Sequence, residues 1–221
     1  MTIQIIGYIQ SGYTLKVIST LLELGIPYEI IIPDKFADIK TPEYLATKHP
    51  FGKIPVLIDD GFQLYESHAI ARYLVNKYQG TKNSTVLIPS DIQKAALVEQ
   101  FISVGRSYHN VPVAKLITQE ISANFLGGTL DPEIIKEARE ETSKVLDVYE
   151  KLLEGKDYLT GEFSLADLLH CPYYCVTTGY DDLWNDPKRP NVARWWKNMS
   201  ERESWKKIIY ELENIPGDIV Y

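Results

Sequence analysis

A glutamate and a serine stand side by side at Glu66 and Ser67, where a strand-like run gives way to a helix-like run. The unpaired amides and the positive end of the dipole at a helix N-terminus attract a carboxylate, so Ser67 is placed to hold one, and Glu66 is placed to hold an ammonium. Together they suit the zwitterionic end of an amino acid. The alternative is that Ser67 only caps the helix and Glu66 is a solvated acid of its first turn, which is the commoner use of these residues.

Ser11 stands at the mouth of the first predicted helix, where its hydroxyl, aided by the helix dipole, could donate a hydrogen bond to a thiolate. A thiol with a pKa of about 8.5 is only a few per cent ionised at pH 7, and lowering that pKa by about two units takes roughly 2.7 kcal/mol. One charge-assisted hydrogen bond, worth about 1.5 to 3 kcal/mol, is of the right size. The competing interpretation is a plain helix N-cap.

Pro55 precedes a predicted strand, a position that a sheet tolerates because proline donates no ladder hydrogen bond. A cis Ile54–Pro55 bond would turn the N–H and C=O of Ile54 outward. They could then pair with an extended peptide, as an added strand pairs with a sheet edge. The alternative is an ordinary trans proline, since cis bonds are a small minority of X–Pro bonds.

The elements that must position these residues follow from hydrophobic periodicity and turn signals. Gly25 is expected to end the first helix, and Asp59-Asp60-Gly61 is a hairpin signal. The order is βαβαββα, a small mixed sheet with helices packed on it. The predicted strands are 3–8, 28–32, 56–58 and 62–65, and the predicted helices are 14–24, 42–47 and 68–78.

The remainder of the chain reads as helical. Residues 79–90 are polar and rich in turn residues, which indicates a linker. Ser90 with Gln93 is predicted to cap a long helix, and Asp131 before Pro132 another. Ser164 and Asp167 stand in capping positions of a third. We therefore expect an α/β domain at 1–79, a linker at 80–90 and an all-helical domain at 91–221.

Composition excludes several classes of function. The 221 residues are 45% hydrophobic and 24% charged, with a formal net charge of -7 and no basic run, which argues against a nucleic-acid or anionic-membrane surface. No apolar stretch approaches the roughly 20 residues that span a bilayer, and the first residues do not read as a signal peptide. Two cysteines exclude a disulfide scaffold and fit a reducing compartment, so we expect a cytoplasmic protein.

The assembled pattern resembles the cytosolic glutathione transferases, and most closely their phi-like branch, over nearly the whole chain. The motifs that carry the resemblance are Ser11 six residues before Val17, KTPE at 40–43, HPFGKIP at 49–55, YES at 65–67 and FSLAD at 163–167.

The resemblance implies a thioredoxin-like domain that binds glutathione, followed by a helical bundle that supplies the pocket for an electrophile. It implies Ser11 as the catalytic serine, a cis Pro55, and pairing of Ile54 with the cysteinyl backbone. By the same similarity Glu66 and Ser67 grip the γ-glutamyl end and Lys40 and Lys53 face the glycyl carboxylate. Phe51 would insert into a partner subunit of a homodimer.

The chain departs from the family pattern next to the serine. Gly12 and Tyr13 follow Ser11 where a threonine usually follows, so the hydroxyl could instead come from Tyr13 or Thr14. The arginine usual after Glu-Ser is His68, and the histidine usual before Lys40 is Ile39.

The helical half offers aromatic candidates for the co-substrate pocket, of which we select Tyr108 and Tyr173 together with Tyr13 of the first domain. Core-edge packing explains such residues about as well. The aromatic and polar-tipped set is Tyr108, His109, Tyr173, Tyr174 and Tyr180.

A metal or redox site at His170, Cys171 and Cys175 is disfavoured. The cysteines lie one helical turn apart rather than in a Cys-x-x-Cys motif, and no second ligand pair occurs elsewhere. Both are treated as small buried hydrophobes, and no metal is expected. The first-domain turn also lacks the cysteine that thiol exchange would need.

The sequence thus predicts a glutathione transferase in which Ser11 stabilises the thiolate of glutathione for attack on a hydrophobic electrophile. One alternative is glutathione-dependent peroxide reduction or ether cleavage at the same site. Another is a largely non-catalytic, ligand-binding relative, although Lys53, Glu66 and Ser67 favour retained glutathione binding.

Overall fold

The computed structural model describes residues 2–125, 127–171 and 179–214. The chain divides into two compact units, one of Met1–Val86 with Asn214–Tyr221 and one of Leu87–Glu213. The first combines strands and helices, and the second contains helices and no strand among its described residues. The predicted fold class, a thioredoxin-like domain followed by a helical domain, is therefore confirmed.

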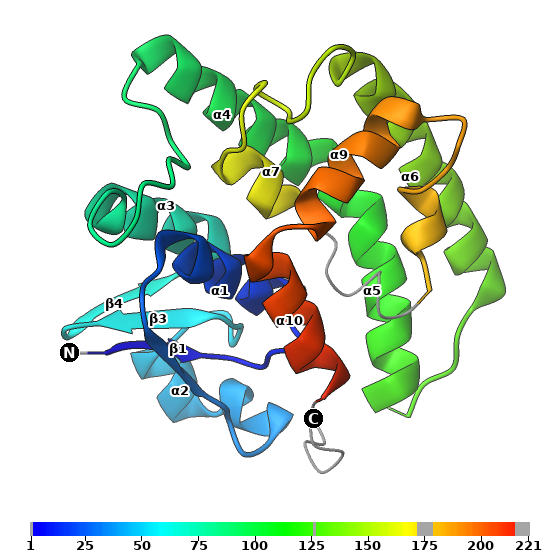
Figure 1. The fold of residues 1–221 in the computed structure, drawn as a ribbon. Helices are drawn as coiled ribbons and strands as arrows, with labels where there is room; N and C mark the ends of the chain where they lie inside the picture. Colours follow the sequence, from blue (N-terminus) through cyan, green and yellow to red (C-terminus); the bar gives the residue numbers. More distant parts are fainter. Residues whose placement is uncertain (1, 126, 172–178, 215–221) are drawn as a thin grey trace. The chain divides into compact units, whose positions relative to one another are not determined.

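The sheet of the first unit has four strands in the order β2-β1-β3-β4. The strands are β1 (Ile3–Ile6), β2 (Tyr28–Ile31), β3 (Val56–Asp59) and β4 (Phe62–Tyr65). β1 pairs in parallel with β2 and antiparallel with β3, and β3 pairs antiparallel with β4. Helices α1 (Gly12–Leu24) and α3 (Ser67–Tyr78) lie against each other on one face, and α2 (Pro42–Thr47) lies on the other (Figure 1).

The β3–β4 hairpin turns as its sequence predicts. Asp59 pairs with Phe62, so Asp60 and Gly61 alone form the loop. Their φ angles are 54° and 83°, and positive φ at both central residues is the requirement of a type I′ turn. Aspartate and glycine tolerate that conformation, which explains why they mark the turn in the sequence.

The far end of α3 is tied to this hairpin through the buried carboxylate of Asp59. Its Oδ2 accepts hydrogen bonds from Tyr73 Oη at 2.7 Å and Lys77 Nζ at 2.8 Å, and Tyr78 Oη donates at 2.8 Å. Burial alone would raise the pKa of Asp59, but these donors outweigh it and hold the pKa below its usual value. The contact fixes α3 against the sheet, and with it the helix N-terminus at the opposite end.

Helix α1 ends as predicted, with Gly25 at φ 69° in the left-handed conformation. It begins at Gly12, two residues before the predicted start, because Ser11 caps it. A short 3-10 helix (η1, Phe36–Lys40) occupies part of the segment expected to be a loop.

The second unit is built from helices around an aromatic core in which Tyr149, Trp184 and Trp195 are at most 2% exposed. Trp196, next to Trp195 in the sequence, is also buried. The helices are α4 (Ile92–Val104), the π-helix η2 (Gly105–His109), α5 (Asn110–Phe125), α6 (Pro132–Leu152), α7 (Leu165–His170), η3 (Asp181–Leu183), α9 (Pro190–Ser200) and α10 (Glu203–Glu213).

The start of α4 corrects the sequence prediction. Its N-cap is Asp91, whose Oδ1 accepts from the N–H groups of Gln93 and Lys94 at 3.0 and 2.9 Å. Ser90 lies one residue too early. The Ser-x-x-Gln pattern at 90–93 predicted a cap one residue before the true one. Aspartate is an equally strong cap, and its carboxylate bonds the second and third amides of the helix directly.

The π-helical turn between α4 and α5 has a packing cause. A Cβ on Gly105 would lie 2.4 Å from His170 Nε2, so only glycine allows the backbone to approach that ring. His170 is fixed there, because its Nδ1 lies 2.6 Å from the carbonyl of Ala166 and its Nε2 2.8 Å from Tyr149 Oη. The imidazole therefore donates from Nδ1 and accepts at Nε2.

The predicted caps of α6 and α7 are confirmed. Asp131 accepts from the N–H groups of Glu133 and Ile134, and Ser164 with Asp167 forms a capping box. Asp167 is fully buried and receives four hydrogen bonds, two on each oxygen: Leu159 N and Trp195 Nε1 on Oδ1, Ser164 N and Ser164 Oγ on Oδ2. Burial raises the pKa of Asp167 to about 6 against these donors, so the group is a carboxylate at neutral pH.

We predict that Asp167→Asn destabilises the fold, because an amide NH₂ in place of Oδ2 leaves the buried N–H of Ser164 without an acceptor, whereas the Ser164 hydroxyl can turn and accept from the new NH₂. The free energy of unfolding should fall by about 1 to 3 kcal/mol, the cost of one orphaned buried donor, in urea denaturation at pH 7. The matched control is Asp131→Asn at an exposed cap, where asparagine serves about as well and the change should be negligible. Equal unfolding midpoints for the two variants would contradict this role of Asp167.

Candidate functional site

One edge of the sheet collects the predicted site residues, and strand pairing is the cause. Ile6 at the end of β1 pairs with Val56 at the start of β3, and Val56 pairs with Tyr65 at the end of β4. The segments that follow Ile6, precede Val56 and follow Tyr65 must therefore meet at the same edge. These segments carry Ser11, the Ile54–Pro55 pair, and the Glu66–Ser67 pair.

Ser11 is half-buried and caps α1 through its side chain. Its Oγ accepts from the N–H of Thr14 at 3.4 Å, so the oxygen is used as an acceptor and the hydroxyl proton is left for an outside acceptor. The next residue need not be glycine, because a Cβ on Gly12 would meet no atom of the described chain within 4 Å. The departure from the family pattern therefore leaves Ser11 at the N-terminus of the helix.

The other two hydroxyls near this turn are placed differently. Thr14 is fully buried, and its Oγ1 has no hydrogen-bond partner among the described residues. A Cβ on Gly7 would lie 2.6 Å from that oxygen, so the threonine is enclosed by the turn. Tyr13 is 51% exposed, with its ring 5.8 Å from Lys16 Nζ. Of these three hydroxyls, that of Ser11 both lies at the helix N-terminus and is accessible to a ligand.

The Ile54–Pro55 peptide bond is cis, and Pro55 is buried directly before β3. Ladder pairing begins at Val56, so the backbone groups of Ile54 lie outside the pairing of β3 with β1 and β4. The N–H and C=O of Ile54 are therefore placed to form hydrogen bonds with the backbone of an extended peptide.

The N-terminus of α3 is open. Its N-cap, Glu66, makes no side-chain capping hydrogen bond, and Ser67 is the first helical residue rather than the cap. Other helices of the described chain have their first amides bonded to side chains: α1 by Ser11, α4 by Asp91, α6 by Asp131, and α9 by Glu150 of α6. The lack of a side-chain cap at Glu66 and the positive end of the helix dipole make the start of α3 suited to an anion.

Glu66 has φ 73° and ψ 107°, a conformation that non-glycine residues rarely adopt. Its side chain is 61% exposed. The turn thus holds an anionic group beside the open amides of α3, with Ser67 buried next to it. Backbone strain of this kind typically persists where function requires it.

The predicted lysines lie on either side of α2, Lys40 at the end of η1 and Lys53 in the loop between α2 and β3. Lys40 Nζ donates to the carbonyl of Gly52, and the carbonyl of Lys53 accepts from Tyr44 Oη at 3.0 Å. Both lysines are exposed, as is Phe51 at 71%. Lys40 thus helps to hold the loop that presents Lys53 and Phe51.

His49 also lies at this edge, although no role was predicted for it from the sequence. It is 2% exposed, its Nδ1 accepts from the N–H of Phe51 at 3.2 Å, and its Nε2 lies 4.0 Å from Glu66 Oε1. Burial lowers its pKa, and Glu66 opposes that effect. The only sequence signal was its place in the motif HPFGKIP.

The structure shows how exposed some of the predicted pocket residues of the second unit are. Tyr108 is 63% exposed, whereas Tyr180 is buried and donates to Glu120 Oε1 at 2.5 Å. Cys171 is buried and forms no disulfide with any described residue, as expected for a small hydrophobe. Tyr173, Tyr174 and Cys175 lie outside the described residues.

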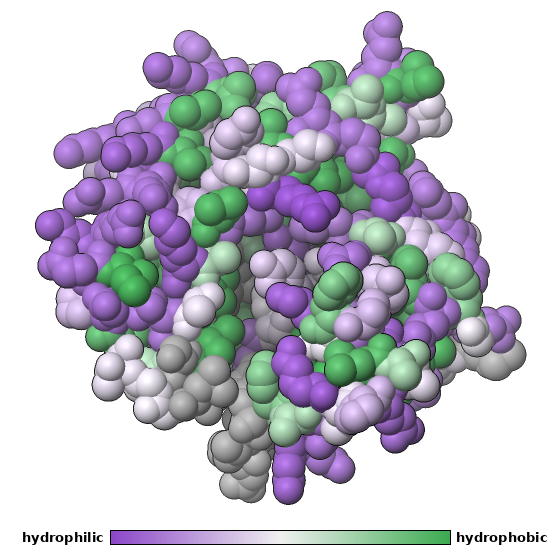
Figure 2. Space-filling view, turned by 180° about the vertical axis from the view of Figure 1, so that it is seen from behind, coloured by the Kyte–Doolittle hydropathy of each residue, from purple (hydrophilic) through white to green (hydrophobic). Residues whose placement is uncertain are grey.

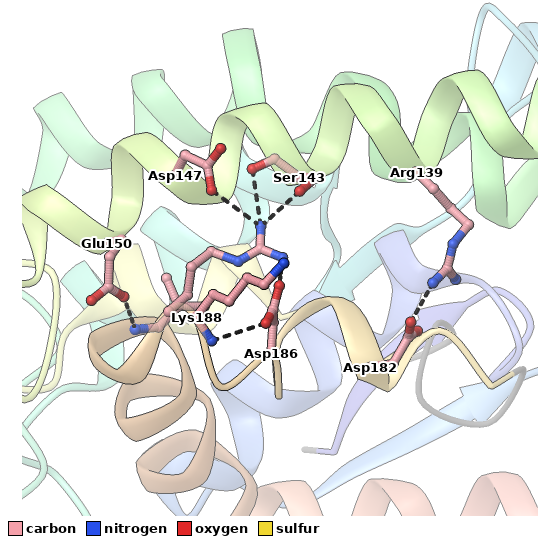
Figure 3. A network of polar contacts seen from close by, with 9 residues as sticks. Arg139, Ser143, Asp147, Glu150, Asp182, Asp186 and Lys188 are labelled. Atoms are coloured by element: carbon pink, nitrogen blue, oxygen red, sulfur yellow. Dashed lines mark hydrogen bonds and ion pairs between the residues drawn. The ribbon is translucent and has the colours of Figure 1, made fainter.

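The described part of the second unit also contains a surface hollow of about 610 Å³ beside α6 and η3. Its charged groups satisfy one another: Arg139 pairs with Asp182, and Arg189 donates to Ser143 Oγ at 3.1 Å and Asp186 Oδ2 at 2.8 Å. Figure 3 shows Ser143, Asp147, Asp186 and Lys188 gathered in this network, which ties the segment before α9 to α6. The arrangement supports packing rather than chemistry.

The described residues contain no group of three or more histidine, cysteine, aspartate or glutamate side chains arranged to hold a metal ion. Among the same residues, no helix is both long and apolar enough to cross a membrane. Figure 2 shows one face of the chain, on which hydrophilic side chains are widespread and hydrophobic ones form separate small groups.

Comparison with protein families gives two matches. Residues 5–82 match the glutathione S-transferase N-terminal domain, and residues 116–203 match the glutathione S-transferase C-terminal domain.

Individual proteins similar to this chain are also named glutathione S-transferases. Glutathione S-transferase F10 of Arabidopsis thaliana is 37% identical over 198 residues, covering 87% of this chain and 90% of the relative. Glutathione S-transferase hmp2 of Hypomyces subiculosus is 38% identical over 216 residues, covering 96% and 99%.

Solved structures superimpose over nearly the whole chain. Glutathione transferase F7 from Populus trichocarpa has a TM-score of 0.86 and 35% identity, covering 95% of this chain and 98% of its own. Glutathione S-transferase I from mais, solved with an atrazine glutathione conjugate, has a TM-score of 0.85 and 31% identity, covering 98% and 100%. Because its sequence relatives and its fold agree over both units, the chain belongs to the glutathione S-transferase family, with F-type, phi-class transferases among its relatives.

Proposed function

We propose that the chain transfers glutathione to a hydrophobic electrophile, with the hydroxyl of Ser11 stabilising the glutathione thiolate. The observation that carries this proposal is the register that brings Ser11, Ile54 and the open N-terminus of α3 to one edge of the sheet. The names of its relatives support a transferase over a dedicated peroxidase or a non-catalytic carrier.

The tripeptide would be held along that edge by groups of complementary charge. The α-carboxylate of the γ-glutamyl residue suits the amides and hydroxyl at Ser67, and its ammonium suits the Glu66 carboxylate. The cysteinyl backbone would pair with Ile54, and the glycyl carboxylate would face Lys40 and Lys53. Each contact uses a different part of glutathione, so together they fix the position of the sulfur.

The Ser11 hydroxyl then donates to the thiolate, an interaction worth about 1.5 to 3 kcal/mol. The sulfur lone pair forms a bond to the electrophilic carbon. The leaving group departs with its electron pair, or, in a conjugate addition, the electrons move onto the acceptor. No protein nucleophile is required, and the enzyme contributes thiolate stabilisation and the juxtaposition of two reactants. We propose exposed Tyr13 and Tyr108 for contact with the electrophile, and Tyr173 by its place in the sequence.

We predict that Ser11→Ala lowers kcat/KM for chlorodinitrobenzene by about 10- to 100-fold, the loss of one charge-assisted hydrogen bond to the thiolate. Glutathione binding, measured by calorimetry, should be largely retained, since the other contacts remain.

The matched control is Thr14→Val, which removes the neighbouring hydroxyl at constant shape. Because Thr14 Oγ1 is buried and has no partner among the described residues, this variant should keep both its turnover and its stability. Full activity of Ser11→Ala, or loss of activity in Thr14→Val, would contradict the proposal that Ser11 stabilises the thiolate.

Glu66 allows a test in which stability and binding move in opposite directions. Glycine adopts φ 73° without a Cβ penalty, so Glu66→Gly should be more stable than Glu66→Gln by about 1 kcal/mol in thermal or urea unfolding. Both variants should bind glutathione more weakly, because both lack the carboxylate. Glutathione affinity equal to that of the parent protein in both variants would remove Glu66 from the binding site.

We further propose a cytoplasmic homodimer that acts in detoxification, with Phe51 as a contact between subunits. An aromatic side chain 71% exposed on a held loop is suited to insertion into a partner. Sedimentation velocity should give the mass of a dimer for the parent protein and mainly that of a monomer for Phe51→Asp. A parent protein that sediments as a monomer at all concentrations would contradict the dimer.

A further inference from the structure

His49 is held in one orientation by the loop that it begins. Its backbone N–H donates to the carbonyl of Tyr44 at 3.1 Å, and its carbonyl accepts from the N–H of Gly52 at 2.8 Å. The ring is 2% exposed and packs against the ring of Tyr65, with centroids 4.6 Å apart. The imidazole therefore has little freedom to rotate.

The hydrogen bond to Phe51 fixes the tautomer. A backbone N–H can only donate, so Nδ1 accepts from it at 3.2 Å and the ring proton of a neutral imidazole must be on Nε2. Nε2 lies 4.0 Å from Glu66 Oε1. That separation is longer than a direct hydrogen bond, and the contact is an electrostatic attraction between an N–H dipole and a carboxylate.

The charge state of His49 matters for the neighbouring carboxylate. Burial lowers the pKa of His49, Glu66 raises it, and Lys53 and Lys40 lower it further, so the ring is neutral at neutral pH. A neutral donor orients the carboxylate without cancelling its charge. Glu66 keeps its full attraction for an ammonium group.

Glu66 is the residue of this edge that most needs such support. Its backbone is in a strained conformation with φ 73°, and its side chain is 61% exposed. Within the described residues, His49 is the one basic side chain within 4.0 Å of that carboxylate. A long exposed side chain without a fixed partner would lose rotamer freedom on binding its ligand.

We propose that His49 is a positioning residue for glutathione, which joins the loop carrying Lys53 to the Glu66 carboxylate and pre-orients that carboxylate for the ammonium of the γ-glutamyl residue. The proposal rests on the proposed function, because it assumes that Glu66 binds this ammonium. It assigns to His49 a role in ground-state binding and none in the chemical step.

Two variants separate the two contacts of the ring. Asparagine places an amide oxygen where Nδ1 lies, so His49→Asn keeps an acceptor for Phe51 N–H but does not reach Glu66. Glutamine places an amide nitrogen where Nε2 lies, so His49→Gln keeps a donor toward Glu66 and gives up the loop acceptor. Steady-state kinetics with chlorodinitrobenzene give kcat and the KM for glutathione, and thermal unfolding checks that each variant is folded.

We expect His49→Asn to raise the KM for glutathione by about 3- to 10-fold with kcat within about two-fold, since a ground-state contact is lost. His49→Gln should restore most of the affinity. The decisive comparison uses a glutathione analogue without the α-amino group of its γ-glutamyl residue. Its KM should be higher than that of glutathione and nearly the same for the parent protein and His49→Asn.

A pH profile gives a second reading. Protonation of His49 places a positive charge 4.0 Å from the Glu66 carboxylate and offsets the attraction of that carboxylate for an ammonium group. The KM for glutathione should therefore rise at acid pH in the parent protein more than in His49→Gln, whose amide stays neutral. The Tyr65 ring packs against the imidazole, Glu66 Oε1 lies 4.0 Å from its Nε2, and Lys53 and Lys40 are the other charged groups that act on its pKa.

The outcomes distinguish this inference from the function on which it rests. If Glu66→Gln raises the KM for glutathione but His49→Asn does not, the role of His49 is overturned and the binding site stands. If His49→Asn has the same effect on glutathione and on the deaminated analogue, His49 serves only the fold, and the proposal is wrong. If Glu66→Gln itself leaves the KM unchanged, the proposed binding mode fails first.

Discussion

Strand register is the constraint on which the site depends. Ile6, Val56 and Tyr65 lie side by side across β1, β3 and β4, so three chain segments distant in sequence reach the same sheet edge together. A slip of one residue in either pairing would turn the buried side chains of that strand outward, so the core that stabilises the sheet also fixes the positions of the site residues. The Asp60-Gly61 turn sets one of the two registers locally.

Some helix termini serve the stability of the fold, and the start of α3 is proposed to serve ligand binding. Where a helix end needs only stability, a side chain satisfies its amides, as Asp91, Asp131 and the Ser164–Asp167 pair do. At α3 the first amides lack a side-chain cap and the preceding residue is strained. The missing cap and the strained backbone make this helix end less stable than the others. Strained residues are common at binding sites, and here the strain accompanies a helix end suited to an anion. Asp59 secures the opposite end of the same helix.

The sequence predicted local features best. The hairpin turn, the left-handed Gly25 and the cap at Asp131 each follow from residue types within a few positions, and the structure has all three. The first cap of α4 was misplaced by one residue because two good caps, at 90 and 91, adjoin. The π-helical turn at Gly105 and the role of His49 could not be predicted, because each depends on a side chain that approaches through tertiary packing: His170 in one case, Glu66 in the other.

The central claim is that glutathione bound at this edge has its sulfur beside the Ser11 hydroxyl. The most direct measurement is the pKa of the bound thiol, obtained by titrating the ultraviolet absorbance of the thiolate in the enzyme complex. The account predicts a value about two units below the roughly 8.5 of a free thiol, with most of that shift abolished in Ser11→Ala. A bound thiol that titrates like the free one, or a lowered value that survives the loss of the hydroxyl, would contradict it.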